Sequence, residues 1–63
     1  MLGKEVKLLR EQKNMTQAQL AQRLGVTQEY VSLLEKGVKY PGLNLGVALA
    51  RVLGTTVEQL VAR

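Results

Sequence analysis

The chain has 63 residues and a formal net charge of +4, from nine lysines and arginines against five acidic residues, and it contains no cysteine and no histidine. We expect residues 1–63 to form one small domain held by helix packing alone, because a disulfide or a thiolate metal site is excluded. No Ser/His/Asp set, His/Cys cluster or close carboxylate pair can be assembled, so we expect no enzyme, no metal and no cofactor.

The first two helices are predicted from apolar periodicity and capping residues. Apolar residues recur at helical intervals over residues 2–12. The next segment, Thr16-Gln-Ala-Gln19, has the form of a capping box, in which the threonine hydroxyl accepts from an early helix amide and the glutamine reaches back. Gly25 should end this second helix, because glycine enters the left-handed conformation without steric cost.

A third helix is predicted over residues 28–35, with Thr27 as its N-cap and Gly37 at its end. Only residues 25–27 join it to the second helix, and so short a turn makes two helices cross steeply, as in a helix-turn-helix. The crossing requires a small residue where the third helix passes over the second, a glycine in the turn and apolar residues that fill the space between the two helices. These requirements are met by Ala21, Gly25, Val26, Val31 and Leu34.

The second half of the chain is predicted to contain a loop and two more helices. Residues 38–43 form the longest loop and include a Pro-Gly turn. The apolar residues between 45 and 53 predict a short fourth helix, whose first turn is weakened by Gly46. A second capping-box sequence, Thr56-Val-Glu-Gln59, opens a last helix. The predicted fold class is therefore all-α, with five short helices around one core.

Residues 6–60 resemble the DNA-binding domain of the phage lambda and 434 repressors and Cro. The resemblance is carried by the segment MTQAQLAQRLGVTQEYVSLLEKG, at residues 15–37, and by single residues on both sides of it. These are Val6, Leu9, Arg10, Pro41, Leu45, Leu49, Ala50, Leu53, Gly54, Val57 and Leu60. The resemblance implies a compact five-helix domain that binds double-stranded operator DNA as a bacterial or phage transcriptional regulator, with the third helix in the major groove. The target sequence cannot be carried over, because the departures from the family's pattern are Glu29, Tyr30, Leu33 and Gly46.

The third helix is predicted to carry the residues that contact bases. At about 100° per residue, Val31 and Leu34 lie on one side and a largely polar arc lies opposite. On this arc Gln28 can bond bidentately to adenine, while Glu29 can accept from the cytosine amino group and Leu33 can pack on the thymine methyl. In the structural alternative, Glu29 only favours the helix N-terminus and Leu33 is an incidental exposed residue. Thr27, the residue before Gln28, would touch a base or a phosphate beside it. The predicted base contacts are therefore Thr27, Gln28, Glu29 and Leu33.

Phosphate contacts are predicted on both sides of the third helix, which we call the reading helix. Such contacts position a domain on DNA without specifying the sequence. Thr16 and Gln17 lie where helix-end amides point at an anion. The resemblance implies that Gln17 binds phosphate and can also brace Gln28. On the other side, two lysines and a backbone amide follow the reading helix. The predicted phosphate contacts are Thr16, Gln17, Ser32, Lys36, Lys39 and Tyr40.

The resemblance also assigns a structural ion pair and a dimer contact. Arg10 and Glu35 are expected to tie the first helix to the third, the alternative being two unrelated surface charges. The dimer contact is expected in the loop before the last helix and in that helix, at Thr55, Thr56, Val57 and Val61. Two copies would then bind a palindromic site with reading helices roughly 34 Å apart. Because the apolar area is small, the free domain should be mainly monomeric.

The charge and the apolar pattern define the expected partners. A basic small domain indicates an anionic partner, nucleic acid first, although +4 also keeps a small protein soluble. No apolar run approaches the roughly 20 residues of a membrane span, and no signal sequence is visible. We therefore expect a cytoplasmic protein with neither a membrane nor a small-molecule partner.

Two other functions stay open. On the same fold, the third helix of an antitoxin-type module would contact a protein; Glu29 and Leu33 favour this reading, because an acid repels phosphate and a leucine suits a protein groove. Lys36, Lys39 and the two glutamines favour DNA. The second alternative is an engineered variant of a repressor scaffold. A strong salt dependence of DNA binding separates the protein-binding reading from the DNA-binding one.

Overall fold

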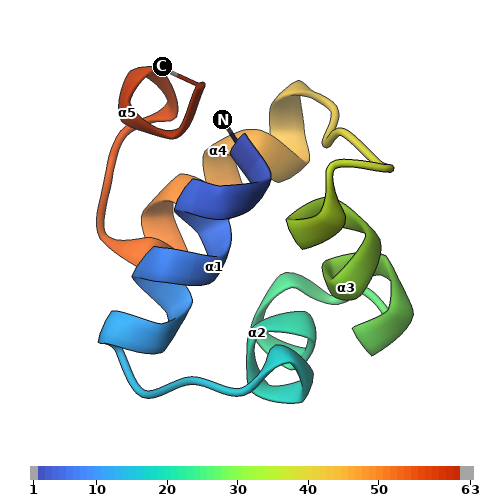
Figure 1. Cartoon of the computed structure of the whole chain (residues 1–63). Coiled ribbons are helices and arrows are strands. Elements are labelled where there is room, and N and C mark those ends of the chain that lie inside the picture. Colours follow the sequence, from blue (N-terminus) through green and yellow to red (C-terminus); the bar gives the residue numbers. More distant parts are fainter. Residues whose placement is uncertain (1, 62–63) are drawn as a thin grey trace.

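The computed structural model describes residues 2–61, in which five α-helices and no strand are present (Figure 1). Residues 1, 62 and 63 of the predicted single domain lie outside the described range. The helices are α1 (Leu2–Gln12), α2 (Gln17–Leu24), α3 (Gln28–Lys36), α4 (Leu43–Leu53) and α5 (Val57–Val61). The predicted all-α fold is confirmed.

Threonine caps determine where α2 and α3 begin. The Thr16 hydroxyl accepts from the Gln19 amide at 3.0 Å, and the Thr16 amide donates to the Gln19 side-chain oxygen at 2.9 Å, so both halves of the capping box are present. The Thr27 hydroxyl accepts from the Tyr30 amide at 3.0 Å. Each cap satisfies an amide that has no partner within its helix, which typically stabilises a helix by about 1 kcal/mol.

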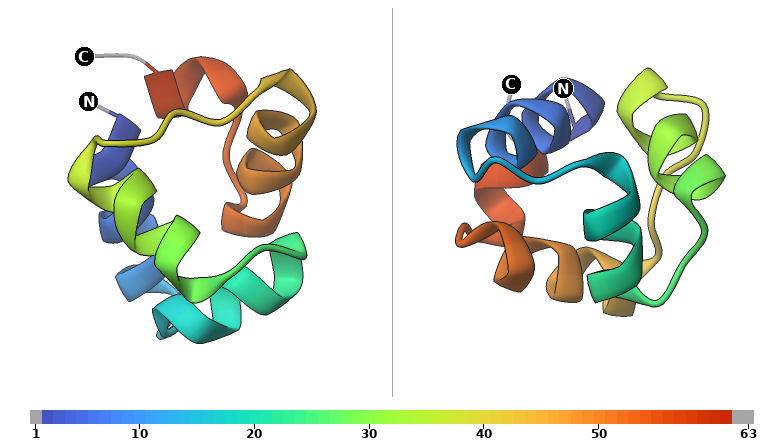
Figure 2. Two further views of the ribbon diagram at one scale, coloured as in Figure 1. Left: turned by 90° about the vertical axis from the view of Figure 1, so that its right-hand side faces the viewer. Right: turned by 90° about the horizontal axis from the view of Figure 1, so that it is seen from below.

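The connection between α2 and α3 is the short turn that the sequence predicts. Gly25 has a φ of 74°, in the left-handed region, and its amide bonds to the carbonyls of Ala21 and Gln22. The Val26 amide also donates to the Ala21 carbonyl, at 3.0 Å. Closing the end of α2 in this way turns the chain at once into Thr27, the cap of α3. The turn holds α3 across α2, on the outside of the domain (Figure 2).

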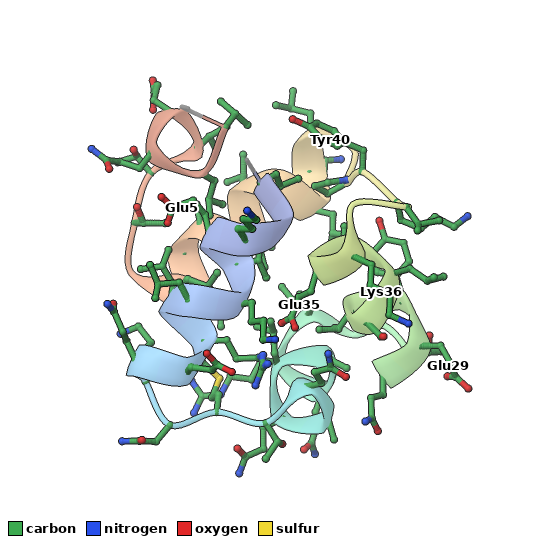
Figure 3. All side chains as sticks on the ribbon, in the orientation of Figure 1. Glu5, Glu29, Glu35, Lys36 and Tyr40 are labelled. Atoms are coloured by element: carbon green, nitrogen blue, oxygen red, sulfur yellow. The ribbon has the colours of Figure 1, made fainter. Side chains whose placement is uncertain are left out.

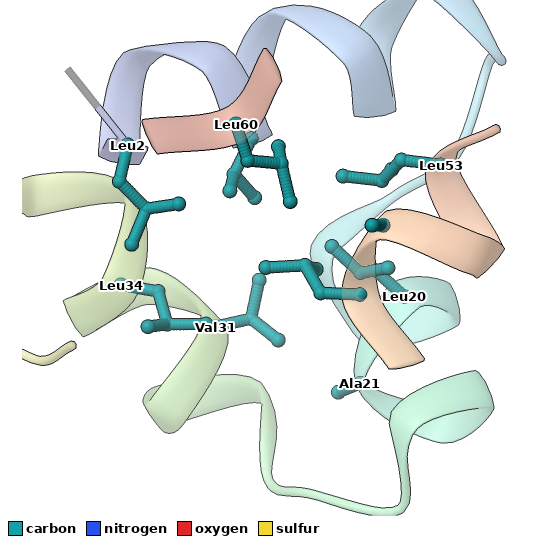
Figure 4. Close-up of a cluster of buried hydrophobic side chains, with 10 residues drawn as sticks. Leu2, Leu20, Ala21, Val31, Leu34, Leu53 and Leu60 are labelled. Carbon is teal, nitrogen blue, oxygen red and sulfur yellow. The ribbon is translucent and has the colours of Figure 1, made fainter. Parts of the chain in front are cut away.

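One apolar core joins all five helices (Figure 4). Burying a leucine or valine side chain contributes roughly 1.5–3 kcal/mol each, so this core is the main source of stability in a chain without cysteine. The core residues are Leu2, Val6, Leu20, Ala21, Val31, Leu34, Leu49, Ala50, Leu53 and Leu60. The pairs α2–α3 and α1–α3 make the most extensive contacts, so the core holds α3 chiefly through its two neighbours.

The boundaries of two helices differ from the prediction. α3 extends to Lys36, and α4 begins at Leu43, so the loop spans residues 37–42. Leu43 is 77% exposed and therefore lies off the apolar stripe from which the fourth helix was predicted. Gly46 does not prevent the first turn, because its amide donates to the Gly42 carbonyl at 2.8 Å.

The close backbone contact of α1 with α3 at Gly3 was not predicted. Gly3 is buried in the first turn of α1. A Cβ atom at this position would lie 2.6 Å from the Glu35 carbonyl oxygen and 2.7 Å from that of Leu34. Both distances are shorter than a Cβ atom tolerates, and both atoms belong to backbone. The glycine therefore allows α1 to rest directly on the last turn of α3.

Candidate nucleic-acid interface

The side chains of α3 divide between the core and the outside. Val31 and Leu34 are fully buried. In Figure 3, Glu29 projects from the outer end of α3, whereas Glu35 points inward toward α1 and α2. The outward arc carries exposed or half-buried side chains at Gln28, Glu29, Ser32 and Leu33. The helix thus offers solvent a continuous face that core packing does not use.

A shallow polar depression of about 380 Å³ opens where the starts of α2 and α3 approach each other. It brings together residues that are separated in the sequence by the turn and by most of α2. Its lining consists of Gln17, Gln28, Glu29 and Ser32. Leu33 is half-buried on α3 and does not belong to the lining. The structure therefore groups three of the outward α3 side chains with one from α2.

The N-termini of α2 and α3 present backbone amides without partners among residues 2–61. In each helix the cap hydroxyl, on Thr16 or Thr27, accepts from the third amide, and the cap carbonyl accepts from the fourth. The first two amides of each helix have no such partner. They belong to Gln17, Ala18, Gln28 and Glu29. Each exposed cap hydroxyl also keeps its own hydrogen for donation, so these helix ends are suited to an anion.

Arg10 and Glu35 form a buried ion pair between α1 and α3. The Arg10 Nε donates to Glu35 Oε2 at 2.6 Å, and Nη2 donates to Oε1 at 3.2 Å. Arg10 Nη1 donates to the Met15 carbonyl at 2.7 Å. The side chains of Arg10 and Glu35 are 10% and 4% exposed. These contacts tie the loop before α2 and the last turn of α3 to one guanidinium group.

The hydrogen bond to Glu35 raises the pKa of Arg10 above its ordinary value; burial acts in the opposite direction, and the charges of Glu35 and Glu11 raise the pKa further. The guanidinium therefore stays charged at any pH at which the domain is used. It can act as a permanent cross-link, and it has no part in proton transfer.

Gln17 makes a contact that was not predicted. Its Nε2 donates to Glu35 Oε1 at 3.0 Å, so the nitrogen of its amide is directed to the ion pair rather than to Gln28. Both glutamines still line the same depression. This hydrogen bond was not predicted, because Gln17 and Glu35 are 18 residues apart and come together only in the tertiary fold. The hydrogen bond from Arg10 to the Met15 carbonyl was not predicted either, although it spans only five residues at the end of α1.

The predicted cationic contacts follow the C-terminal end of α3. Lys36 and Lys39 are exposed, and Figure 3 shows Lys36 on the outer side of α3, the side from which Glu29 projects. The amides of Val38 and Lys39 both donate to the Leu33 carbonyl, at 2.9 and 3.2 Å, which folds this segment back over the helix end. Tyr40 is 69% exposed. A basic, exposed end therefore lies about one helix length from the polar depression.

Comparisons with known proteins identify the family. A family model described as helix-turn-helix matches residues 6–60. The chain belongs to the lambda-repressor- and Cro-like helix-turn-helix family. It is 42% identical over 55 residues to an uncharacterized HTH-type transcriptional regulator of Archaeoglobus fulgidus, covering 87% of this chain and 78% of the relative.

A phage protein and a solved structure add to this assignment. The immunity repressor protein of Bacillus phage phi105 is 30% identical over 60 residues, which cover 95% of this chain and 42% of the phage protein. The structure of SinR, described as the master regulator for biofilm formation in complex with DNA, has a TM-score of 0.88 and 27% identity, covering 97% of this chain and 98% of that one. The helix-turn-helix domain described here is thus a DNA-binding domain of transcription regulation.

The region expected to pair two helix-turn-helix domains lies at α5 and the loop before it. Thr55 is half-buried, and the Thr56 hydroxyl accepts from the Gln59 amide at 3.1 Å, which caps α5. Val57 is half-buried against the core, and Val61 is 45% exposed. Both valines line an apolar groove of about 160 Å³. Its other lining residues are Leu2, Tyr40, Pro41, Gly42, Leu43, Gly46 and Leu60.

Two further observations concern other kinds of site in this helix-turn-helix domain. Between residues 2 and 61, no helix has both the length and the apolar character that crossing a bilayer requires. The same residues include no group of three or more side chains suited to hold a metal ion.

Proposed function

We propose that the domain reads a specific double-stranded DNA site with α3 in the major groove and acts as a repressor-like regulator of the bacterial or phage type. The observation that carries this proposal is the polar depression at the starts of α2 and α3. There, side chains with hydrogen-bonding groups adjoin helix ends with unpaired amides. Base edges and phosphates require these two kinds of group side by side.

The base contacts in this proposal come from the first turns of α3. The exposed amide of Gln28 is suited to adenine, which offers one donor and one acceptor in the major groove. Glu29 can accept from the amino group of cytosine, and Leu33 can pack on a thymine methyl. Thr27, at the start of the helix, has a hydroxyl hydrogen left to donate, because its oxygen already accepts from Tyr30.

The phosphate contacts lie at both ends of this surface. At one end are the cap hydroxyl of Thr16 and the unpaired backbone amide of Gln17. Ser32 lies in the depression between the two helices. At the other end are the exposed side chains of Lys36 and Lys39 and the backbone amide of Tyr40. A DNA backbone on each side would hold α3 in the groove and leave the reading to its first turns.

Two copies are proposed to bind one palindromic site, with their reading helices roughly 34 Å apart. The contact is proposed at Thr55, Thr56, Val57 and Val61. The apolar groove that both valines line supports this placement. Because Val57 also packs on the core, little apolar area remains for the partner, and the free domain should be mainly monomeric. DNA then supplies the effective concentration that pairing requires.

Selection of bound sequences from random duplex DNA tests this function. The expected result is a defined half-site whose affinity falls steeply with salt, by about 0.9 in log K per unit of log salt for each phosphate neutralised. Lys39→Ala should lower this slope by about 1, and Arg51→Ala, a loss of the same charge from the exposed face of α4, should leave it nearly unchanged. If no sequence is enriched and salt has little effect, α3 contacts a protein instead.

A further inference from the structure

The carboxylate of Glu35 does more than balance the charge of Arg10. Its Oε2 accepts from Arg10, and its Oε1 accepts both from Arg10, at 3.2 Å, and from Gln17 Nε2, at 3.0 Å. An ionised carboxylate can only accept hydrogen bonds. The group that Gln17 turns toward it must therefore be the nitrogen of the amide. The ion pair consequently selects one of the two orientations that a glutamine amide can adopt.

The side-chain oxygen of Gln17 remains available to the polar depression. Nitrogen and oxygen are bonded to the same planar carbon and point in different directions, so a nitrogen held by Glu35 leaves the oxygen free for another partner. Gln17 lines the depression together with Gln28. Gln17 can therefore offer an acceptor to the depression, and its orientation is set by the Glu35 side chain, which is only 4% exposed.

We propose that Glu35 is a positioning residue that determines which atom Gln17 presents to Gln28 and, through it, which base Gln28 prefers. This inference rests on the proposed function. An acceptor beside Gln28 favours the orientation in which the nitrogen of Gln28 faces Gln17. A donor would favour the reverse orientation. Reversal exchanges the donor and the acceptor that Gln28 offers to a base edge, and adenine and guanine differ in that pattern.

The variant Glu35→Gln tests the proposal because it changes one acceptor into a donor at nearly constant size. The new amide oxygen can still accept from Arg10, and the new nitrogen donates toward Gln17, which then turns its oxygen inward. Binding is measured on four duplexes that differ only at the base pair identified by Gln28→Ala, at a temperature where circular dichroism shows a folded domain. Preference at this base pair should fall by about fivefold or more or pass to another base, with the other positions unchanged.

A double variant shows whether Glu35 acts through Gln17. In a Gln17→Ala background, adding Glu35→Gln should leave the base preference as it was in Gln17→Ala alone. The proposal is overturned if Glu35→Gln weakens all four duplexes equally, or if its effect on preference persists without Gln17. Either result would leave Glu35 with a purely structural role.

A measurement without DNA keeps the test decisive if Glu35→Gln does not fold. In the unchanged domain, NMR should show slower solvent exchange of the Gln17 side-chain amide than of Gln22, an exposed glutamine on the same helix. Glu35→Asp keeps the charge for Arg10 but is one methylene shorter, and it should remove the protection. Equal exchange at the two glutamines in the unchanged domain would overturn the proposal. A failure to select any DNA sequence would instead refute the proposed function and leave this measurement valid.

Discussion

At the scale of single residues, the contacts of Arg10 show how a charge can be kept inside a small domain. The guanidinium forms hydrogen bonds with a carboxylate and a backbone carbonyl, so three of its nitrogen atoms have partners. The carboxylate of Glu35 accepts from Gln17 as well. Taking two charges out of water is costly, and such a pair is favourable only when the remaining donors and acceptors are also satisfied. Here they are.

Removing one member of the ion pair should therefore destabilise the domain strongly. Arg10→Met or Glu35→Leu alone should lower the free energy of unfolding by about 3–5 kcal/mol, because the other charge is left buried without its partner. The double variant should lose much less. Urea unfolding at neutral pH measures these differences, with Arg51→Met as a control for an exposed arginine. Single variants that unfold at the same urea concentration as the parent would contradict the account.

The pKa of Arg10 predicts that this contribution does not change with pH over the usual range. A base whose pKa is raised in the folded state contributes stability that is fully present below its unfolded pKa and is lost only as the pH rises through its folded pKa. Arg10 should therefore stay protonated between about pH 6 and pH 9. Over this interval its titration should not change the difference in free energy of unfolding between the parent and Arg10→Met. A loss of that difference over this interval with a midpoint assigned to Arg10 by NMR would contradict the reading.

At the scale of helices, two glycines within helices have opposite surroundings. Gly3 brings α1 against the carbonyls of Leu34 and Glu35, where a Cβ atom has no space. Gly46 lies within α4, and a Cβ atom there would meet nothing within 4 Å. Glycine in a helix interior costs about 0.5–1 kcal/mol relative to alanine, through backbone entropy. The same substitution should therefore have opposite signs at the two positions.

Gly3→Ala should destabilise the domain by about 1–3 kcal/mol, because backbone atoms must move to admit the methyl group. Gly46→Ala should stabilise it by about 0.5–1 kcal/mol. Thermal unfolding of the two variants beside the parent gives both signs in one experiment. An unchanged or higher melting temperature for Gly3→Ala would show that α1 does not rest on α3 as described.

The helices and the turn could be predicted because their signals are local. The capping box at Thr16 and the left-handed glycine at position 25 act within a few residues of chain, and both are present in the structure. The start of α4 was predicted too late, because Leu43 is exposed and adds nothing to an apolar stripe. The contact of Gly3 and the hydrogen bond from Gln17 to Glu35 depend on how helices meet. The spacing of residues along the sequence does not specify such contacts between helices.

At the scale of the whole molecule, the polar depression and the proposed pairing contact on α5 are separate. The depression lies at the starts of α2 and α3, and the apolar groove lies between the loop before α4, the start of that helix and α5. Exposed apolar residues, among them Tyr40, Leu43 and Val61, gather at the groove. A change on α5 at the groove should therefore affect cooperation between two copies without affecting how one copy binds its half-site.

Val61→Glu should abolish cooperative binding to a palindrome, because it places like charges across a two-fold contact. Affinity for an isolated half-site should stay within about twofold, since the reading helix is untouched. Gln59→Glu adds the same charge to an exposed position on α5 outside the groove lining and serves as the matched control. Gel-shift titrations on the two kinds of duplex measure both quantities. Full cooperativity in Val61→Glu would place the contact elsewhere.

The effect of Gln28→Ala on binding to the selected DNA site shows whether α3 reads bases. If Gln28 contacts a base, the variant should lose about 1–3 kcal/mol in binding free energy on that site, show a relaxed preference at one base pair and bind unrelated duplexes nearly as before. Gln22→Ala, which removes an exposed glutamine from α2 outside the depression, should leave all three unchanged. Equal weakening of Gln28→Ala on every duplex would contradict base reading by α3.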